Sequence, residues 1–434
     1  MAGQMAGMTL SLKTVLALSR GIGLVASPFI RAVAAREKSV LSDGRRGHYP
    51  ENITLKAPWD IWLHAVSVGE VAVARAVVDE LLELDDSLKV IVSSFTATGF
   101  QHAEKLLAGR CEVIPAPMDL PGCVSNALKA IKPAVYATVE TELWPNMLCR
   151  AQSSGVLTAI LNGRISDRSF PSYRKIRGIV APLLEGMGLV CALTDKYAGR
   201  FASLGADPSV IRVCGNAKYS RLSGTGRLSR PKVPVLRGLD GRKVWIAGST
   251  RSGEEDMVIA AHKKVLDEFP DSLLFMAPRH MKNVEHIMET CDNHGMSSVL
   301  FSGGSTVAGA SVCIVDVIGC LFDLYGMSDA AFVGGSLVPR GGQNVMEPAA
   351  WSRPVIHGPH MSNFEDARDA LDSAGGSILV RNGDELADAV IKLLSSPDLA
   401  MNLGRAARKA LEKAGHGAAA RQAGLLLELL RQSA

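Results

Sequence analysis

Glu70 is the first residue of this sequence whose type and setting could do chemistry. It ends the stretch HAVSVGE (64–70), where the apolar run WDIWL gives way to VAVARAVVDELLEL. The first pattern predicts a buried strand and the second an amphipathic helix. A carboxylate at such a corner faces solvent or a ligand, because it cannot lie unpaired in a hydrophobic core. Glu70 is therefore the first candidate for a general base.

Further polar groups follow predicted strands in the first half of the chain. In TVETELWPN, Glu140 ends a strand and Glu142 comes next. No His or Asp stands at ligand spacing beside this pair, so we expect no metal site there. In CGNAKY, Lys218 lies just beyond a strand, where it could contact a phosphate or simply be solvated. His64 could be a base, but the alternation along WLHAV favours a hydrogen-bonded core histidine.

The second half holds a glycine-rich stretch, AAFVGGSLVPRGGQNVMEP. Its glycine pairs allow the backbone to wrap closely around an anion. A helix that we expect to begin near Asn344 points its N-terminus at the same space, and Glu347 could accept hydrogen bonds from ribose hydroxyls. Arg279 ends the strand in FMAPRH, where it could bind a phosphate or a stacked base, or instead cap a loop carbonyl. With the strand end DVIGCL (316–321), these residues predict a nucleotide pocket.

The elements that must position these residues alternate regularly. The strand-like runs of the first half are DIWLHAV, LKVIVSSF, AVYATVE, VLTAILN, LVCALT and IRVCG. After a stretch rich in Gly, Ser, Pro and Arg, the pattern restarts with KVWIAGS, SLLFMAP, SSVLFSG, SVCIVD, AAFVGGS, RPVIHG and SILV. Helical stretches separate the runs, which predicts parallel sheets covered by helices on both faces.

We therefore expect an α/β protein with two doubly wound, Rossmann-like domains that face each other across a cleft. Ligands of such sheets bind at the carboxyl ends of the strands. The expected divisions are an N-terminal interfacial segment (1–50), a first domain (51–218), a linker (219–242) and a second domain (243–434).

Composition limits the function classes. The chain has 434 residues, too many for one ordinary core, and its net charge of +4 is too small to indicate nucleic-acid binding. Its eight cysteines show neither C-x-x-C nor zinc spacing, which favours a reducing compartment, the cytoplasm.

The start of the chain predicts contact with a membrane surface. Between Met8 and Arg36, basic residues interrupt the apolar sequence, and its longest uncharged run, Gly21 to Ile30, is shorter than the about 20 apolar residues of a spanning helix. We expect a helix that lies in the interface with its basic residues on anionic headgroups, or alternatively one packed on the protein's own core. A basic stretch, GRISDRSFPSYRKIRG, suits an acidic acceptor or headgroup, or is a solvated helix face. Its cations are Arg164, Arg168, Arg174, Lys175 and Arg177.

Several motifs together resemble the 3-deoxy-D-manno-octulosonic acid (Kdo) transferases of lipopolysaccharide synthesis. They are HAVSVGE, ETELWPN, GNAKY, STRSGEE, APRH, FVGGSLVPRGGQNVMEP and GPHMSNFED, in the family's order from about residue 50 to about residue 370. The resemblance implies a GT-B fold with a membrane-associated N-terminus. It also implies inverting transfer of Kdo from CMP-Kdo to the tetraacylated lipid A precursor at the cytoplasmic face of the inner membrane. We expect no metal cofactor, since no D-x-D motif occurs, and no nucleic-acid partner, since the net charge is small.

The resemblance assigns roles to particular residues. Glu70 is the catalytic base, and Glu140 and Lys218 support the transition state. Cys320 stands where many members have glutamate, so only a backbone contact carries over there. The residues that the resemblance assigns to CMP contacts are Pro278, Arg279, Gly319, Cys320, Leu321, Asn344, Val345, Met346 and Glu347.

Two other functions fit parts of the pattern. A GT-B-type nucleotide-sugar epimerase shares the expected fold but needs no lipid acceptor. A non-catalytic, nucleotide-binding peripheral membrane protein would bind CMP without turnover, and it leaves Glu70 and Glu140 unexplained.

Overall fold

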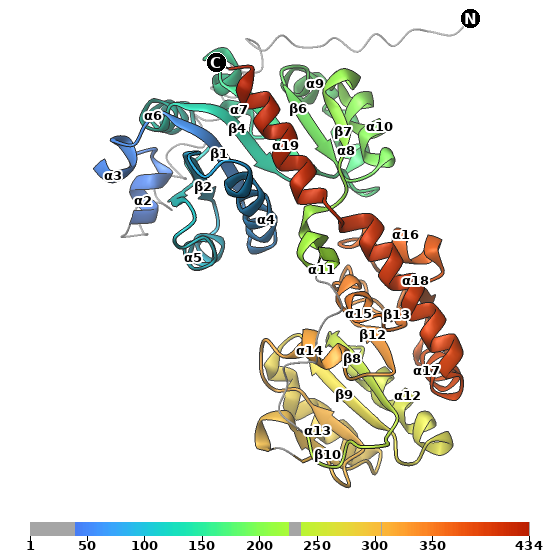
Figure 1. Ribbon diagram of the computed structural model, residues 1–434. Coiled ribbons are helices and arrows are strands. Elements are labelled where there is room, and N and C mark those ends of the chain that lie inside the picture. The colour runs from blue at the N-terminus through green and yellow to red at the C-terminus, as the bar shows by residue number, and fades with distance from the viewer. Residues whose placement is uncertain (1–39, 225–235, 305, 434) are drawn as a thin grey trace, which may run out of the picture. The chain divides into compact units, whose positions relative to one another are not determined.

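A computed structural model describes residues 40–224, 236–304 and 306–433 of the chain. Contacts divide the chain into two compact units (Figure 1). Unit 1 contains the residues up to Arg221 together with those from Gly417 onward, and unit 2 contains Leu222–His416. Each unit is built around its own parallel sheet.

The sheet of unit 1 has seven strands, and every neighbouring pair is parallel. They are β1 (Trp59–Ala65), β2 (Val90–Ser94), β3 (Glu112–Pro115), β4 (Pro133–Val139), β5 (Leu157–Gly163), β6 (Leu189–Ala192) and β7 (Ile211–Val213). The strand order is β3-β2-β1-β4-β5-β6-β7. Interior strands such as β1 and β4 are mostly apolar and buried along nearly all of their length, because helices cover both faces of a parallel sheet.

Helices lie on both faces of this sheet. They are α2 (Val40–Arg45), α3 (Glu51–Thr54), α4 (Val68–Leu84), α5 (Ala97–Leu106), α6 (Pro121–Ile131), α7 (Pro145–Ser153), α8 (Phe170–Lys175), α9 (Arg177–Glu185) and α10 (Asp195–Leu204), with short 3₁₀ turns η1 (Pro208–Val210) and η2 (Ala217–Tyr219). The short helix α11 (Ser220–Gly224) spans the division between the two units. Alternate residues of β1 face opposite sides. Ile61 and Leu63 pack with α4, whereas Trp62 packs with residues of α6, α7 and α10.

Unit 2 repeats this architecture. Its strands are β8 (Val244–Thr250), β9 (Leu273–Pro278), β10 (Ser298–Leu300), β11 (Val312–Ile314), β12 (Ala330–Val333), β13 (Val355–His357) and β14 (Ser377–Leu379). They form a parallel sheet in the order β10-β11-β9-β8-β12-β13-β14. Its helices are α12 (Glu255–Glu268), α13 (Val284–Asn293), α14 (Leu321–Tyr325), α15 (Met346–Ala350), α16 (Glu365–Ala374), α17 (Gly383–Ser395) and α18 (Pro397–Gly415), with 3₁₀ turns η3 (Met281–Asn283) and η4 (Phe301–Gly303).

The last helix, α19 (Ala418–Arg431), belongs to unit 1 although it follows unit 2 in sequence (red in Figure 1). It packs against α4, β5 and β6. Ala423 and Leu426 join the same hydrophobic cluster as Ile61. The sequence-based division placed the whole of 243–434 in the second domain, and the structure differs from it here. An amphipathic pattern shows that a helix has an apolar face, but not which sheet that face covers.

Two expected divisions fall partly outside the described residues. Of the N-terminal segment 1–50, only the residues from Val40 onward are described, and of the linker 219–242 the residues 225–235 are not. Within the described ranges, no helix combines the length and the apolar character needed to span a membrane. The expected class, two α/β units with parallel sheets, is confirmed; the membrane-associated helix stays a prediction.

Candidate active site

The corner between β1 and α4 folds the Glu70 carboxylate back over the backbone. Glu70 is the third residue of α4 and is only 7% exposed. Its Oε2 accepts a hydrogen bond from the Val66 N–H at 2.7 Å, and its Oε1 accepts one from the Ser67 hydroxyl at 2.7 Å. The arrangement is related to a capping box, in which a carboxylate of the first helical turn satisfies donors that precede the helix. These two bonds allow a carboxylate to lie in a largely buried position.

Burial raises the pKa of Glu70 to about 7. The hydrogen bonds from Ser67 and Val66 lower it, since they stabilise the charged form, and the negative charges of Glu140 and Glu142 raise it further. A general base works best when its pKa lies near the working pH, because it is then both deprotonated and basic enough to take a proton. The surroundings of Glu70 therefore suit the role expected from the sequence.

Glu140 occupies a strained position directly after β4. Its φ is +61°, in the left-handed region that non-glycine residues seldom adopt. The backbone is held there by a hydrogen bond from the Glu140 N–H to the Leu161 carbonyl at 2.8 Å. Arg164 Nε donates to Glu140 Oε2 at 3.1 Å. Strain of this kind is concentrated at functional sites.

Arg164 is a site residue that the sequence reasoning missed, because it grouped this arginine with the exposed basic stretch. Its position after a strand could have identified it as a site residue. Arg164 directly follows β5, as Glu140 directly follows β4, and the two strands are neighbours. Carboxyl ends of neighbouring parallel strands meet at one edge of the sheet.

Glu142 completes a carboxylate cluster, by which we mean Glu70, Glu140 and Glu142. Burial and the charge of Glu140 raise the pKa of Glu142. Its Oε2 accepts a hydrogen bond from Trp144 Nε1 at 2.8 Å. The cluster thus contains two carboxylates, Glu70 and Glu142, whose charged forms are disfavoured by burial and by the negative charge of Glu140.

Two conservative variants should move the pH profile in opposite directions. With Glu70 as the base, kcat/KM falls by about tenfold per pH unit below about pH 7, because the carboxylate becomes protonated. In Glu142→Gln a like charge is lost, so the pKa of Glu70 falls and this acid limb moves to lower pH. In Ser67→Ala a hydrogen bond to the carboxylate is lost, so the pKa rises and the limb moves to higher pH.

The measurement is kcat/KM against pH for the three proteins. The glutamine oxygen of the first variant can still accept the bond from Trp144, which keeps the local structure comparable. Limbs that stay in place, or move in the same direction, would remove Glu70 as the titrating group.

His64 is a core residue and not a base. It is 1% exposed, its Nδ1 lies 2.9 Å from Ser93 Oγ, and its ring packs edge-on against Trp144. Burial lowers the pKa of His64 to about 3, so the imidazole is neutral at physiological pH. The favoured interpretation, a hydrogen-bonded core histidine, is confirmed.

Lys218 lies in η2, just beyond β7, as the sequence indicates. The Asn216 side chain caps this turn by accepting a hydrogen bond from the Lys218 N–H at 3.0 Å. The turn packs against α4, the helix that begins beside Glu70, and against α19. All three residues assigned to catalysis, Glu70, Glu140 and Lys218, are therefore in unit 1.

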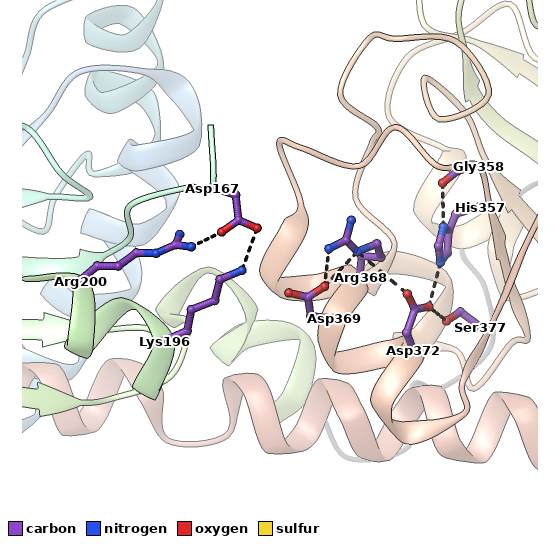
Figure 2. A network of polar contacts seen from close by, with 9 residues as sticks. All are labelled: Asp167, Lys196, Arg200, His357, Gly358, Arg368, Asp369, Asp372 and Ser377. Atoms are coloured by element: carbon purple, nitrogen blue, oxygen red, sulfur yellow. Dashed lines mark hydrogen bonds and ion pairs between the residues drawn. The ribbon is translucent and has the colours of Figure 1, made fainter. Parts of the chain in front are cut away.

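Part of the basic stretch is held by contacts with side chains of α10. Asp167 forms an ion pair with Lys196, at 3.0 Å, and another with Arg200 (Figure 2). The Arg200 guanidinium also lies over the ring of Phe170, 5.1 Å from its centroid. These contacts fix the loop that leads into α8. The other cations of the stretch have exposed side chains: Arg168, Arg174, Lys175 and Arg177.

In unit 2, the residues assigned to CMP gather at the carboxyl edge of the sheet. Pro278 ends β9, and the Arg279 N–H donates to the Thr250 carbonyl at the end of β8 (2.9 Å), while the Arg279 side chain is exposed. Gly319 has a φ of +101° and leads through Cys320, the N-cap residue, into α14. β11, which precedes this turn, is the other neighbour of β9.

The second group, Asn344–Glu347, leads into α15, which begins at Met346, two residues later than expected. Asn344 Oδ1 accepts from the Met346 N–H at 3.2 Å, and Asn344 Nδ2 donates to Glu347 Oε1 at 3.1 Å. Val345 and Met346 are fully buried, so their side chains serve packing. Helix α14 packs against α15, which brings the two assigned groups together. Burial, and then the charge of Glu347, raise the pKa of Tyr325 on α14.

The described residues contain no evident metal site. No group of three or more His, Cys, Asp or Glu side chains there lies close enough to hold a metal ion.

Comparison with known proteins identifies relatives over nearly the whole chain. Residues 32–221 match the family model of 3-deoxy-D-manno-octulosonic-acid transferase (kdotransferase). The 3-deoxy-D-manno-octulosonic acid transferase of Haemophilus influenzae is 32% identical over 391 residues, covering 89% of this chain and 90% of that protein. The enzyme of the same name from Bordetella pertussis is 32% identical over 368 residues, covering 82% and 83%.

Among solved structures, the UDP-GlcNAc 2-epimerase of Neisseria meningitidis bound to UDP-GlcNAc has a TM-score of 0.61. The alignment covers 86% of this chain and 100% of that one at 13% identity, so it shows a common GT-B-like fold and no more. The alignment with the Haemophilus protein covers 89% of this chain and therefore extends into both units. The chain therefore belongs to the 3-deoxy-D-manno-octulosonic acid (Kdo) transferase family of glycosyltransferases.

Proposed function

We propose that this protein transfers Kdo from CMP-Kdo to a hydroxyl of the tetraacylated lipid A precursor, with inversion at the anomeric carbon. Membership in the Kdo transferase family supports the sugar that is moved. The observation that carries the catalytic part is the Glu70 carboxylate at the β1–α4 corner, with its pKa raised to about 7 by burial.

In the proposed reaction, Glu70 takes the proton of the acceptor hydroxyl while that oxygen attacks the anomeric carbon of Kdo. The bond from this carbon to the phosphate oxygen breaks, and its electron pair leaves with CMP. Attack and departure occur on opposite faces, so the configuration inverts. Glu140, held by Arg164, and Lys218 support the charge distribution of the transition state.

The donor nucleotide is proposed to bind unit 2. The exposed Arg279 guanidinium suits the CMP phosphate, because its planar fork can hold two phosphate oxygens. The half-buried Glu347 suits the ribose hydroxyls as an acceptor. A monophosphate leaving group carries less charge than a diphosphate, so we expect transfer to continue in the presence of EDTA.

We also propose that the protein acts at the cytoplasmic face of the inner membrane. The exposed cations Arg168, Arg174, Lys175 and Arg177 support attraction to anionic headgroups. Residues 1–50 are the proposed interfacial segment. Flotation with vesicles of anionic and of neutral lipid tests this part by itself, and equal recovery with both would contradict it.

One assay tests the reaction. The protein is incubated with CMP-Kdo formed in place and the tetraacylated precursor, and the lipid product is examined by mass spectrometry. A mass increase of one or more Kdo units is expected. The same assay separates the two alternatives: an epimerase would convert a nucleotide sugar without any lipid, and a binding protein would retain CMP without turnover.

A further inference from the structure

Glu254 is a buried carboxylate of unit 2 that none of the assigned roles uses. It is 0% exposed and is the N-cap residue of α12, directly after β8 and its short loop. Four backbone N–H groups donate to it. Oε2 accepts from Arg251 (2.9 Å) and Gly335 (2.6 Å), and Oε1 accepts from Ser336 (2.9 Å) and Leu337 (2.8 Å).

These bonds connect the β8–α12 corner to the turn that follows β12. Three consecutive N–H groups, from Gly335 to Leu337, converge on one carboxylate, so the turn is shaped around a negative charge. The approach is too close for side chains: a Cβ at Gly334 would lie 2.6 Å from the Thr250 Cα. A single carboxylate thus joins the ends of two neighbouring strands.

The turn after β12 also holds the stretch assigned to CMP. The Gly335 carbonyl accepts from the Gly342 N–H at 2.7 Å, and Gly342 stands two residues before Asn344. On the other side, Ser336 Oγ accepts from the Gly358 N–H at 2.9 Å. The Gly358 carbonyl lies 2.9 Å from His357 Nδ1, and His357 Nε2 lies 3.0 Å from Asp372 (Figure 2). Glu254 therefore stands at the centre of a hydrogen-bonded framework that includes the glycine turns.

Glu254 and Glu70 occupy comparable corners of the two units, each after an interior strand of its sheet. Glu70 has two hydrogen-bond donors and lies near two other carboxylates. Glu254 has four backbone donors on its two oxygens. Each oxygen of Glu70 thus accepts one hydrogen bond, whereas each oxygen of Glu254 accepts two and is engaged in holding the backbone.

We propose that Glu254 is a positioning residue of the donor site: its carboxylate fixes the Gly334–Leu337 turn and, through the Gly335 carbonyl, the glycine turn that presents Asn344–Glu347 to the nucleotide. The inference rests on the proposed CMP-Kdo donor. In Glu254→Gln, an amide NH₂ replaces one oxygen and faces N–H groups, which leaves at least two buried donors without an acceptor.

The test compares Glu254→Gln with Glu255→Gln. Glu255 is also 0% exposed and stands next in sequence, but its Oε1 accepts only from the Asn283 side chain, and its Oε2 has no hydrogen-bond partner in the described structure. Removing that charge leaves the glycine turns untouched. We expect the Kd for CMP to rise by about 10–100-fold in Glu254→Gln, the size that one or two unsatisfied buried donors would cause. In that variant kcat at saturating donor should be less affected than KM, and in Glu255→Gln the Kd should stay near the wild-type value.

Amide exchange separates positioning from folding. In Glu254→Gln, exchange should accelerate at Gly335, Ser336 and Leu337, while the amides of β8 and β9 keep their protection. Wild-type CMP affinity together with faster exchange at that turn would overturn the proposal, as would an equal loss of affinity in the two variants.

Should Glu254→Gln fail to fold, Glu254→Asp keeps the charge but is too short to reach all four donors, and undiminished CMP affinity in it would overturn the proposal. If neither variant folds, amide exchange of the wild-type protein with and without CMP tests the proposal. A preformed turn is already protected at Gly335–Leu337 without CMP, and protection that arises only with CMP would contradict it. A wild-type protein that binds no CMP would reject the donor assignment, whereas exchange in the ligand-free protein still reports on the turn.

Discussion

Glu70→Gln is expected to lower kcat for Kdo transfer by about 10²–10⁴-fold, the usual cost of losing a general base. The substitution should leave the fold intact. The glutamine oxygen can accept from the Val66 N–H, and the Ser67 hydroxyl, which now donates to Glu70, can instead accept from the amide NH₂. CMP affinity should not change, because the residues assigned to the nucleotide are all in the other unit.

Single-turnover kinetics with CMP-Kdo and the lipid acceptor measure the loss, and calorimetry with CMP measures the retained binding. Glu83→Gln is the matched control, since Glu83 is an exposed carboxylate of the same helix. The residual activity of Glu70→Gln should also lose the acid limb below about pH 7. Near-normal turnover in this variant would reject Glu70 as the base, whatever the fate of the donor site.

The strands of unit 2 could all be predicted from the sequence, and those of unit 1 with one exception. The exception is β3 (Glu112–Pro115), a four-residue edge strand whose first two residues are only half-buried. Its signal is short because an edge strand has one neighbour and incomplete cover. Interior strands such as β1 and β8 carry long apolar runs, since both of their faces are covered.

Residues at strand ends could be assigned to a site because a parallel sheet puts all carboxyl ends at one edge. Glu70, Glu140 and Arg279 were found in this way. Partners could not be found, because a hydrogen bond between segments distant in sequence leaves no local pattern. The pairing of Arg164 with Glu140 and the four donors of Glu254 depend on how neighbouring strand ends meet, which only the folded backbone specifies.

The packing of α19 on unit 1 is also a contact between segments distant in sequence, so the sequence alone does not predict it. The same helix leads to the second prediction. Gln422, on the apolar side of this helix, is 0% exposed. Its Oε1 accepts from the Asn162 N–H at 2.9 Å, and its Nε2 donates to the Gly215 carbonyl at 3.2 Å. Asn162 has a φ of +54°, and its own Oδ1 accepts from the Ala217 N–H at 2.8 Å. One side chain from the end of the chain thus holds the end of β5 and the turn that carries Lys218.

Gln422→Ala should destabilise unit 1 by about 2–6 kcal/mol, because a buried N–H and a buried carbonyl each lose their partner at a cost of about 1–3 kcal/mol. Hydrogen exchange at the buried amides of β1 and β5 measures this loss. Turnover should fall as well, since the turn before Lys218 loses its support. Glu428→Ala, at an exposed position of the same helix, is the control and should change neither quantity. Unchanged protection in Gln422→Ala would mean that water replaces both bonds, and that α19 stabilises unit 1 through its apolar residues alone.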